Sequence, residues 1–268
     1  MYKHFLLVPF LFFLTSTLNA QVQSSLIAVL QTKSFGKLKK YMDSVNRNEG
    51  SATIYRDYIR NLTTGYKEVI FCVDARIYKK ENPSSYEFDW FRITCITTSK
   101  ILCYYELSKR KDTLVGGQKE HYYETITRYR NDSTYQLFRN EFQTLFQTKI
   151  DEHELFDEES VYEEGCGLGG WPSEWEEKIR HFVKNKERGS LMVWLHSANT
   201  EKQLYALKGL SQLKKKNRLQ LSAHEKKIIQ FIKHKKGTVR YCKGCVFGPP
   251  PSVRRIARKF NLGILALL

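Results

Sequence analysis

Two changes in hydrophobic period limit the folds that are open to this chain of 268 residues. From Glu68 onward, apolar side chains recur at every second position, which is typical of half-buried strands. Residues 25–45, before this stretch, and residues 133–146, after it, carry apolar side chains at helical spacing instead. We therefore expect an α+β fold in which an N-terminal helix, a four-stranded antiparallel meander and a second helix follow one another.

The expected strands are short and are separated by turn residues. They cover residues 68–77, 86–97, 101–108 and 121–130. Pro83 lies in a turn between the first two, and residues 112–117 form a loop that ends in two glycines. Residues 53–66 are rich in tyrosine and fit neither period. This order of elements resembles that of cystatins, which implies a layered fold but no particular function.

Two further helices are marked by capping boxes, in which an N-cap side chain and a residue three positions later exchange hydrogen bonds. Thr200 with Gln203 begins one predicted helix, and Ser222 with Glu225 begins the next. Their short connection predicts that they are antiparallel neighbours. The pair is similar to the helical hairpins of HEAT and armadillo proteins over about one repeat, and this resemblance implies a small all-α domain.

A run of acidic residues separates the two parts of the chain. Residues 151–177 include 11 Asp and Glu residues and neither Lys nor Arg, and we place the domain boundary there. The predicted divisions are a signal peptide (1–20), an α+β domain (21–150), an acidic, glycine-containing linker (151–172), an α-helical domain (173–247) and a proline spacer with a basic amphipathic tail (248–268).

The start of the chain has the layout of a secretory signal peptide. Lys3 precedes an apolar run over residues 5–14, and Ala20 supplies a small residue for cleavage. The run is too short to span a bilayer, which takes roughly twenty apolar residues. We therefore expect an exported protein, periplasmic, cell-surface or secreted, whose mature chain begins at Gln21 and contains no transmembrane helix.

Positive charge is concentrated towards the C-terminus. Residues 201–260 hold 17 Lys and Arg against two acidic residues, whereas residues 21–200 hold 26 of each sign. This asymmetry indicates an anionic partner, and export favours anionic lipid, lipopolysaccharide, an acidic glycan or another envelope protein over nucleic acid. Solvation of the lysines, or pairing with the acidic run, explains the same charges without a partner.

The tail carries the residues that we expect to contact an anionic surface. Ser252 begins a predicted amphipathic helix whose basic face is formed by Arg254, Arg255, Arg258 and Lys259. Its opposite face is apolar, so such a helix can lie in a membrane interface. A tail that docks on the body of the protein, or that is disordered, is the alternative.

Six cysteines suit disulfide formation in an oxidising compartment. Proximity favours a Cys242–Cys245 bridge, with a bridge to Cys166 as the alternative. Cys95 falls opposite Cys103 if a three-residue loop joins their strands, and opposed residues are nearly close enough to cross-link.

A zinc site is a competing explanation for some of these thiols, because thiolate and imidazole are zinc ligands. Its ligands would be Cys166, His234, Cys242 and Cys245. The spacing lacks a second regular ligand pair, so we prefer disulfides. The sequence also lacks the spacing of a phosphate-binding loop or an EF-hand, and we expect no cofactor.

Two classes of function remain open, because no motif has the spacing of a catalytic site. The first is a non-enzymatic binding or scaffolding protein whose basic helical part contacts anionic surfaces. The second is an exported hydrolase with a site at the domain junction. An apolar cleft with convergent polar groups and shifted pKa values would favour the hydrolase.

Overall fold

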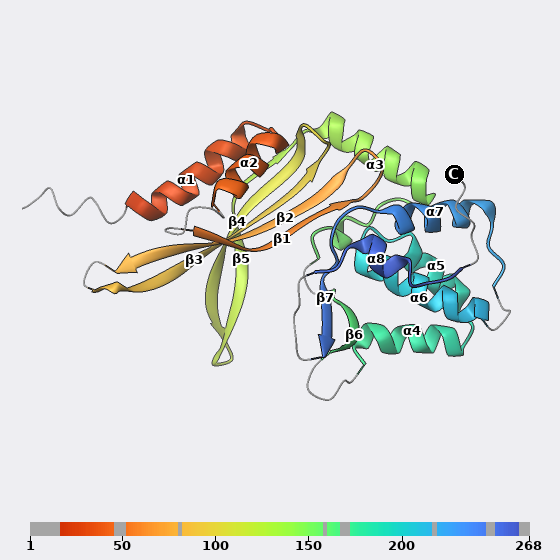
Figure 1. Ribbon diagram of the computed structural model, residues 1–268. Helices are drawn as coiled ribbons and strands as arrows, with labels where there is room; N and C mark the ends of the chain where they lie inside the picture. The colour runs from red at the N-terminus through yellow and green to blue at the C-terminus, as the bar shows by residue number, and fades with distance from the viewer. Residues whose placement is uncertain are drawn as a thin grey trace, which may run out of the picture. The chain divides into compact units, whose positions relative to one another are not determined.

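The computed structural model describes residues 17–45, 52–79, 82–157, 160–166, 172–215, 219–244 and 250–262. The chain forms two compact units with mixed α and β structure (Figure 1). Unit 1 comprises Met1–Asp57 and Val69–Asp132, and unit 2 comprises Tyr58–Glu68 and Ser133–Leu268. The division therefore falls before residue 133, not within the acidic run at 151, and a short piece near residue 60 also belongs to unit 2.

A five-stranded sheet, in the order β1-β2-β3-β4-β5, forms the body of unit 1. Its strands are β1 (Ala52–Asn61), β2 (Lys67–Lys79), β3 (Asn82–Thr97), β4 (Leu102–Val115) and β5 (Gln118–Arg130). The pairs β3–β4 and β4–β5 are antiparallel. The expectation of four strands is wrong, because β1 occupies the tyrosine-rich stretch that fitted neither period.

The β4–β5 hairpin also runs through residues expected to form a loop. Val115 pairs with Gln118, so only Gly116 and Gly117 remain in the turn. Both glycines have positive φ, +58° and +83°. Two-residue hairpin turns of this kind need positive φ at both positions, which glycine adopts without steric cost.

The expected N-terminal helix is divided into α1 (Thr17–Gln31) and α2 (Phe35–Val45). Lys33 has a φ of +53°, which ends α1, and Ser34 forms a bridge with Ile101. The apolar side chains of both helices are buried in the core of unit 1: Leu26, Leu30, Phe35, Leu38 and Met42. Helix α1 includes Ala20, where we predicted cleavage, while most of the predicted signal peptide lies outside the described residues.

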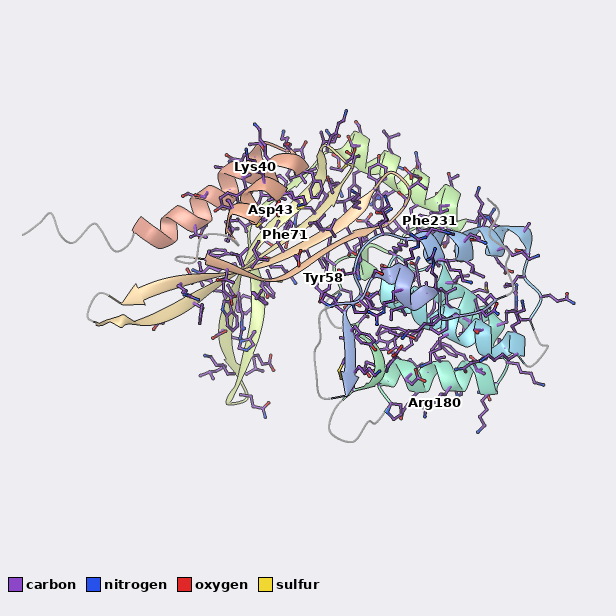
Figure 2. The ribbon with its side chains drawn as sticks, in the orientation of Figure 1. Lys40, Asp43, Tyr58, Phe71, Arg180 and Phe231 are labelled. Atoms are coloured by element: carbon purple, nitrogen blue, oxygen red, sulfur yellow. A yellow bond between two sulfur atoms is a disulfide. The ribbon has the colours of Figure 1, made fainter. Side chains whose placement is uncertain are left out.

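Unit 2 is not all-α, contrary to our expectation. Its helices are α3 (Asp132–Phe146), α4 (Glu174–Lys184), α5 (Arg188–Leu195), α6 (Thr200–Lys215), α7 (Ala223–His234) and the short α8 (Val253–Ala257), with a 3₁₀ turn at Glu152–Glu154. A parallel pair of strands, β6 (Tyr162–Cys166) and β7 (Tyr241–Gly244), is also present. Aromatic residues fill the core beside α3, where the ring of Phe146 lies 5.9 Å from that of Phe231 on α7. Phe231 is labelled in Figure 2.

The capping box predicted for one of these helices is confirmed, and the one predicted for another is wrong in detail. Ser222 and Glu225 form the complete capping box at the start of α7. Helix α6 exists, but its cap is Asn199, whose side chain accepts a hydrogen bond from the N–H of Lys202 at 2.9 Å. Thr200 already belongs to the helix, so its hydroxyl cannot cap it.

The acidic run is not a free linker, because it pairs with the basic part of unit 2. Lys202 Nζ lies 2.8 Å from Glu154, Lys208 Nζ lies 2.5 Å from Glu176, and Lys259 Nζ lies 2.5 Å from Glu164. Part of the charge asymmetry in the sequence is therefore neutralised within the protein. This agrees with the explanation, left open by the sequence, that the basic residues pair with the acidic run.

The tail lacks the free apolar face that an interfacial helix requires. Helix α8 ends at Ala257, and the apolar side chains Val253, Ile256, Ala257 and Leu262 are buried. The tail thus docks on unit 2, and the amphipathic-helix hypothesis is wrong for the described part. Arg254, Arg255 and Arg258 remain exposed, while Lys259 is the partner of Glu164. Within the described ranges, no helix has the length and apolar character needed to cross a membrane.

Candidate functional site

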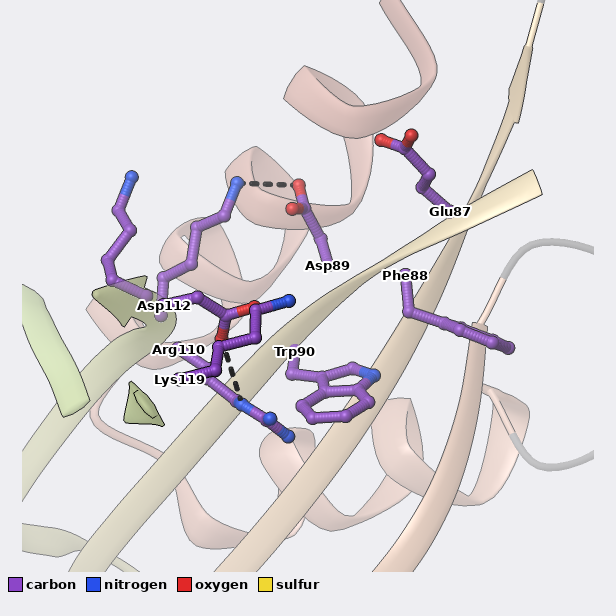
Figure 3. A pocket seen from close by; sticks show the side chains of 9 residues that line it. Glu87, Phe88, Asp89, Trp90, Arg110, Asp112 and Lys119 are labelled. Atoms are coloured by element: carbon purple, nitrogen blue, oxygen red, sulfur yellow. Dashed lines mark hydrogen bonds and ion pairs between the residues drawn. The ribbon is translucent and has the colours of Figure 1, made fainter. Parts of the chain in front are cut away.

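A pocket of about 610 Å³ opens on the sheet of unit 1 (Figure 3). Strand β3 supplies one side, and β4 with the start of β5 supplies the other. Its lining residues are Glu87, Phe88, Asp89, Trp90, Lys109, Arg110, Lys111, Asp112 and Lys119. Aromatic and charged side chains therefore share one concave surface, which is the usual setting for a binding site.

Arg110 is the centre of this surface. Its guanidinium carbon lies 3.5 Å from the centroid of the Trp90 ring, and its Nε lies 3.5 Å from Asp112. It also contacts His121 on β5. Stacking of this kind orients a guanidinium and a tryptophan ring relative to each other. The floor of the pocket is therefore held in one arrangement before any ligand arrives.

Two buried polar atoms beside Arg110, Asp74 Oδ1 and Trp90 Nε1, lack hydrogen-bond partners in the part of the chain that the structure describes. Nε of Arg110 makes no hydrogen bond there either, and only its ion pair with Asp112 at 3.5 Å is described. Burial raises the pKa of Asp74, and the nearby Arg110 opposes that shift. Buried polar atoms are normally satisfied by protein, water or a bound molecule. This cluster therefore distinguishes the pocket from an ordinary sheet surface.

The pocket lysines differ in how firmly they are held. Lys109 Nζ lies 2.6 Å from Asp89, and both side chains are largely buried. Lys119 Nζ lies 2.9 Å from Asp112, with side-chain exposures of 66% and 42%, and Lys111 lies 3.6 Å from the exposed Glu124. Exposed pairs contribute about 0–1 kcal/mol. A ligand carboxylate can therefore replace the partners of Lys111 and Lys119 at little cost.

His121 and Asp112 are arranged like part of a catalytic triad, since His121 Nδ1 lies 2.7 Å from Asp112 Oδ1. A hydrolase would need a nucleophile at the other ring nitrogen. That nitrogen, Nε2, instead faces the guanidinium of Arg110. Among the described residues, His121 therefore contacts a carboxylate through one ring nitrogen and a guanidinium through the other.

A second polar cluster is buried inside unit 2, and the sequence did not reveal it. Arg60 donates from Nε to Glu68 at 2.5 Å and from Nη1 to both oxygens of Glu201 at 2.7 and 2.8 Å. Lys235 Nζ donates to Gln203 at 2.9 Å. All five side chains are almost completely buried.

Gly237 is required where the chain passes this cluster. A Cβ atom there would lie 2.5 Å from Cα of Arg60 and 2.6 Å from the carbonyl oxygen of Ile59, and its φ is +118°. No other residue type satisfies both conditions. Gly237 thus allows the backbone of its segment to approach Arg60.

The ionisation of Lys235 makes the free energy of unfolding depend on pH. Burial, with a smaller contribution from Arg60, lowers the pKa of Lys235 to about 7. In the unfolded chain the pKa of lysine is about 10.4. Between these values the unfolded chain binds a proton that the folded chain does not, so folding becomes more favourable as pH rises above about 7.

We expect the Lys235→Met variant to remove this response. Relative to that variant, the wild-type protein should gain about 1 kcal/mol of unfolding free energy per pH unit from pH 8 to 10. Urea unfolding at several pH values measures the difference. Lys236→Met is the control, because Lys236 is exposed, and it should follow the wild type at every pH. A constant difference between wild type and Lys235→Met would contradict the prediction.

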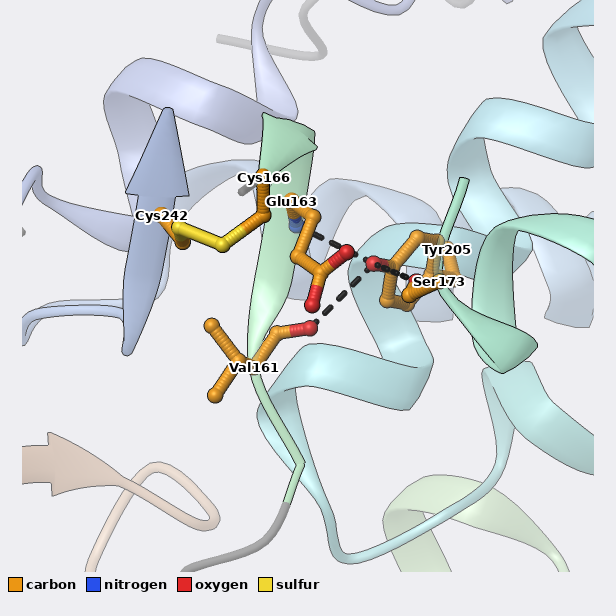
Figure 4. Close-up of a disulfide and its surroundings, with 6 residues drawn as sticks. All are labelled: Val161, Glu163, Cys166, Ser173, Tyr205 and Cys242. Carbon is orange, nitrogen blue, oxygen red and sulfur yellow. Dashed lines mark hydrogen bonds between the residues drawn. A yellow bond between two sulfur atoms is a disulfide. The ribbon is translucent and has the colours of Figure 1, made fainter. Parts of the chain in front are cut away.

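The cysteines are distributed differently from our expectation. Cys166 and Cys242 form a disulfide that joins β6 to β7 (Figure 4), so the preferred Cys242–Cys245 bridge is wrong and the alternative is correct. Cys245 lies outside the described residues. Cys95 and Cys103 are buried and not bridged, because a register shift at Ile96 and Thr97 places Cys95 opposite Tyr105.

The zinc hypothesis loses its ligands for the same reason. The thiols of Cys166 and Cys242 are joined to each other, and His234 Nδ1 lies 2.9 Å from the carbonyl oxygen of Gln230 on its own helix. In the part of the chain that the structure describes, no group of three or more His, Cys, Asp or Glu side chains is placed to hold a metal ion.

Sequence reasoning missed the pocket residues, although a signal was present. Phe88, Trp90 and Arg92 alternate along one strand, so they share a face of the sheet. Large aromatic and basic side chains on an outward face are unusual for a structural strand.

The comparisons with known proteins identify no similar protein from which a function could be inferred. No protein-family model matches the sequence, and neither curated proteins nor solved structures give a match. The geometry of the pocket in unit 1 and of the buried cluster in unit 2 must therefore carry the functional argument.

Proposed function

We propose that this is an exported, non-enzymatic binding protein whose pocket in unit 1 binds an acidic glycan. The observation that carries the proposal is the combination of an ordered aromatic floor with two loosely paired lysines in one concave surface. The disulfide and the absence of a membrane-spanning helix in the described residues are compatible with export.

The aromatic residues suit the apolar face of a sugar ring. Phe88 is 46% exposed at the edge of the pocket, and Trp90 is fixed against Arg110. The C–H groups on one face of a pyranose can cover such a ring, and burying this apolar surface favours binding. Side chains that are already ordered lose little conformational entropy when the ligand binds.

The lysines suit the acidic groups of the same ligand. Lys111 and Lys119 form exposed ion pairs at 3.6 and 2.9 Å, whereas Lys109 forms a largely buried pair with Asp89 at 2.6 Å. A carboxylate on the sugar can therefore accept from the two loosely paired lysines while the rest of the pocket is unchanged. Binding should accordingly weaken as salt concentration rises.

The double variant Lys111→Gln/Lys119→Gln should bind an oligogalacturonate about tenfold more weakly than the wild type, because two modest charge contacts are lost. Isothermal titration at low and moderate salt measures the affinity. The matched control is Lys226→Gln/Lys227→Gln, which removes the same charge from exposed positions on α7. It should bind like the wild type.

Two outcomes would contradict the proposal that the glycan binds in the pocket of unit 1. Unchanged affinity in the pocket variant would show that the lysines do not contact the glycan. Loss of affinity only in the α7 variant would place binding on the basic helices of unit 2 instead. Phe88→Ala provides an independent check, since it should weaken binding of a neutral oligosaccharide as well.

A further inference from the structure

Arg240 is a buried cation whose side chain has no hydrogen-bond partner in the structure. The residue is 4% exposed, and its Nε, Nη1 and Nη2 atoms are all covered and unpaired. A guanidinium does not lose its proton in a protein, so it cannot become neutral to avoid the cost of burial. Because an unpaired buried charge is strongly unfavourable, a bound species must satisfy these donors.

A second guanidinium offers a free donor in the same part of unit 2. The backbone N–H of Arg240 donates to Glu201 at 3.0 Å, and Glu201 is also bound by Arg60. The Arg240 guanidinium lies 5.6 Å from the ring centroid of Tyr58, two residues before Arg60 on β1. Nη2 of Arg60 is itself buried and unpaired. Glu201 therefore joins the two residues, through the side chain of Arg60 and the backbone N–H of Arg240.

The carboxylates of the cluster are already occupied. Glu68 accepts from Arg60 and from the N–H of Phe156 at 2.6 Å, and Glu201 accepts from Arg60 and from the N–H of Arg240. In the hydrogen bonds described for the cluster, neither carboxylate bonds the guanidinium of Arg240. The missing component has acceptor oxygens and negative charge.

We propose that the buried, unpaired guanidinium of Arg240 binds one small oxyanion inside unit 2. The fork of N–H donors on a guanidinium matches two oxygens of a phosphate, sulfate or carboxylate group. Burial limits the ligand to a single small group. This site belongs to unit 2 and does not depend on the glycan pocket of unit 1, so either proposal can fail alone.

The test is the melting temperature of the full chain in phosphate, sulfate or acetate, compared with chloride at equal ionic strength. An anion that binds only the folded state stabilises it, and at many times its dissociation constant should raise the melting temperature by roughly 5 °C. Titration calorimetry should give one site per chain. A response to phosphate and sulfate alone identifies a tetrahedral anion, and a response to acetate identifies a carboxylate.

The Arg240→Met variant should lose this response, because it removes the unpaired donors while keeping an apolar stem. The control is Arg254→Met, which removes an exposed charge and should respond like the wild type. If Arg240→Met does not fold, calorimetry on the wild type still decides the question. The proposal is overturned if the wild type shows no anion dependence, as when water alone satisfies Arg240, or if Arg240→Met keeps the full response.

Discussion

Replacement of Arg60 by methionine is expected to lower the free energy of unfolding of unit 2 by about 3–5 kcal/mol. Arg60 is the only buried side chain that bonds both Glu68 and Glu201 in the hydrogen bonds described for the cluster. Methionine fills similar space but leaves two buried carboxylates facing each other without their cation. Removal of one partner from a buried ion pair is costly because the remaining charge stays desolvated.

Urea unfolding followed by circular dichroism measures this effect. The matched control is Arg139→Met, which breaks the pair with Glu152, where both side chains are partly exposed. That variant should lose only about 0–1 kcal/mol. Arg60→Lys should fall between the two, since it keeps the charge but not the fork of donors. Equal losses in Arg60→Met and Arg139→Met would contradict our account of the cluster.

Removal of the Cys166–Cys242 bridge is expected to cost about 4 kcal/mol. The bridge closes a loop of 76 residues, and a cross-link across a loop of this length strongly restricts the unfolded chain. The double variant Cys166→Ser/Cys242→Ser opens the loop without leaving a lone thiol. Comparison of its urea midpoint with that of the oxidised wild type measures the loss.

Reduction supplies the control for this prediction. A reducing agent should bring the wild type close to the double variant and leave the double variant unchanged. Peptide mapping under non-reducing conditions should recover Cys166 and Cys242 in one linked pair. Recovery of a Cys242–Cys245 pair instead would show that the short bridge forms and that this assignment is wrong.

The disulfide also shows why proximity in sequence is a poor guide to pairing. Cys242 lies on β7, which runs parallel to β6 and brings Cys166 within 5.5 Å, Cα to Cα. Strand β6 is held against α6 by Tyr205, whose hydroxyl accepts from the N–H of Glu163 and donates to the carbonyl of Val161 (Figure 4). These contacts join residues more than forty positions apart, and no local pattern announces them.

The sequence by itself determined the features that depend on a few neighbouring residues. The capping box of α7, the apolar stripe of α3 and the alternation in the strands could all be recognised in the sequence. Each is an interaction between residues up to four positions apart, or a periodicity within one element. Such interactions form within one helix or strand and do not depend on how the rest of the chain folds.

Only the tertiary structure decided the features that join distant residues. It paired Arg60 with Glu201 across 141 positions, selected Cys166 as the partner of Cys242, and placed Trp90 against Arg110 from neighbouring strands. It also buried the apolar face of the tail that the sequence left free to bind a membrane. The physical reason is that burial, strand register and charge pairing depend on which surfaces meet, and that choice is made by the whole chain at once.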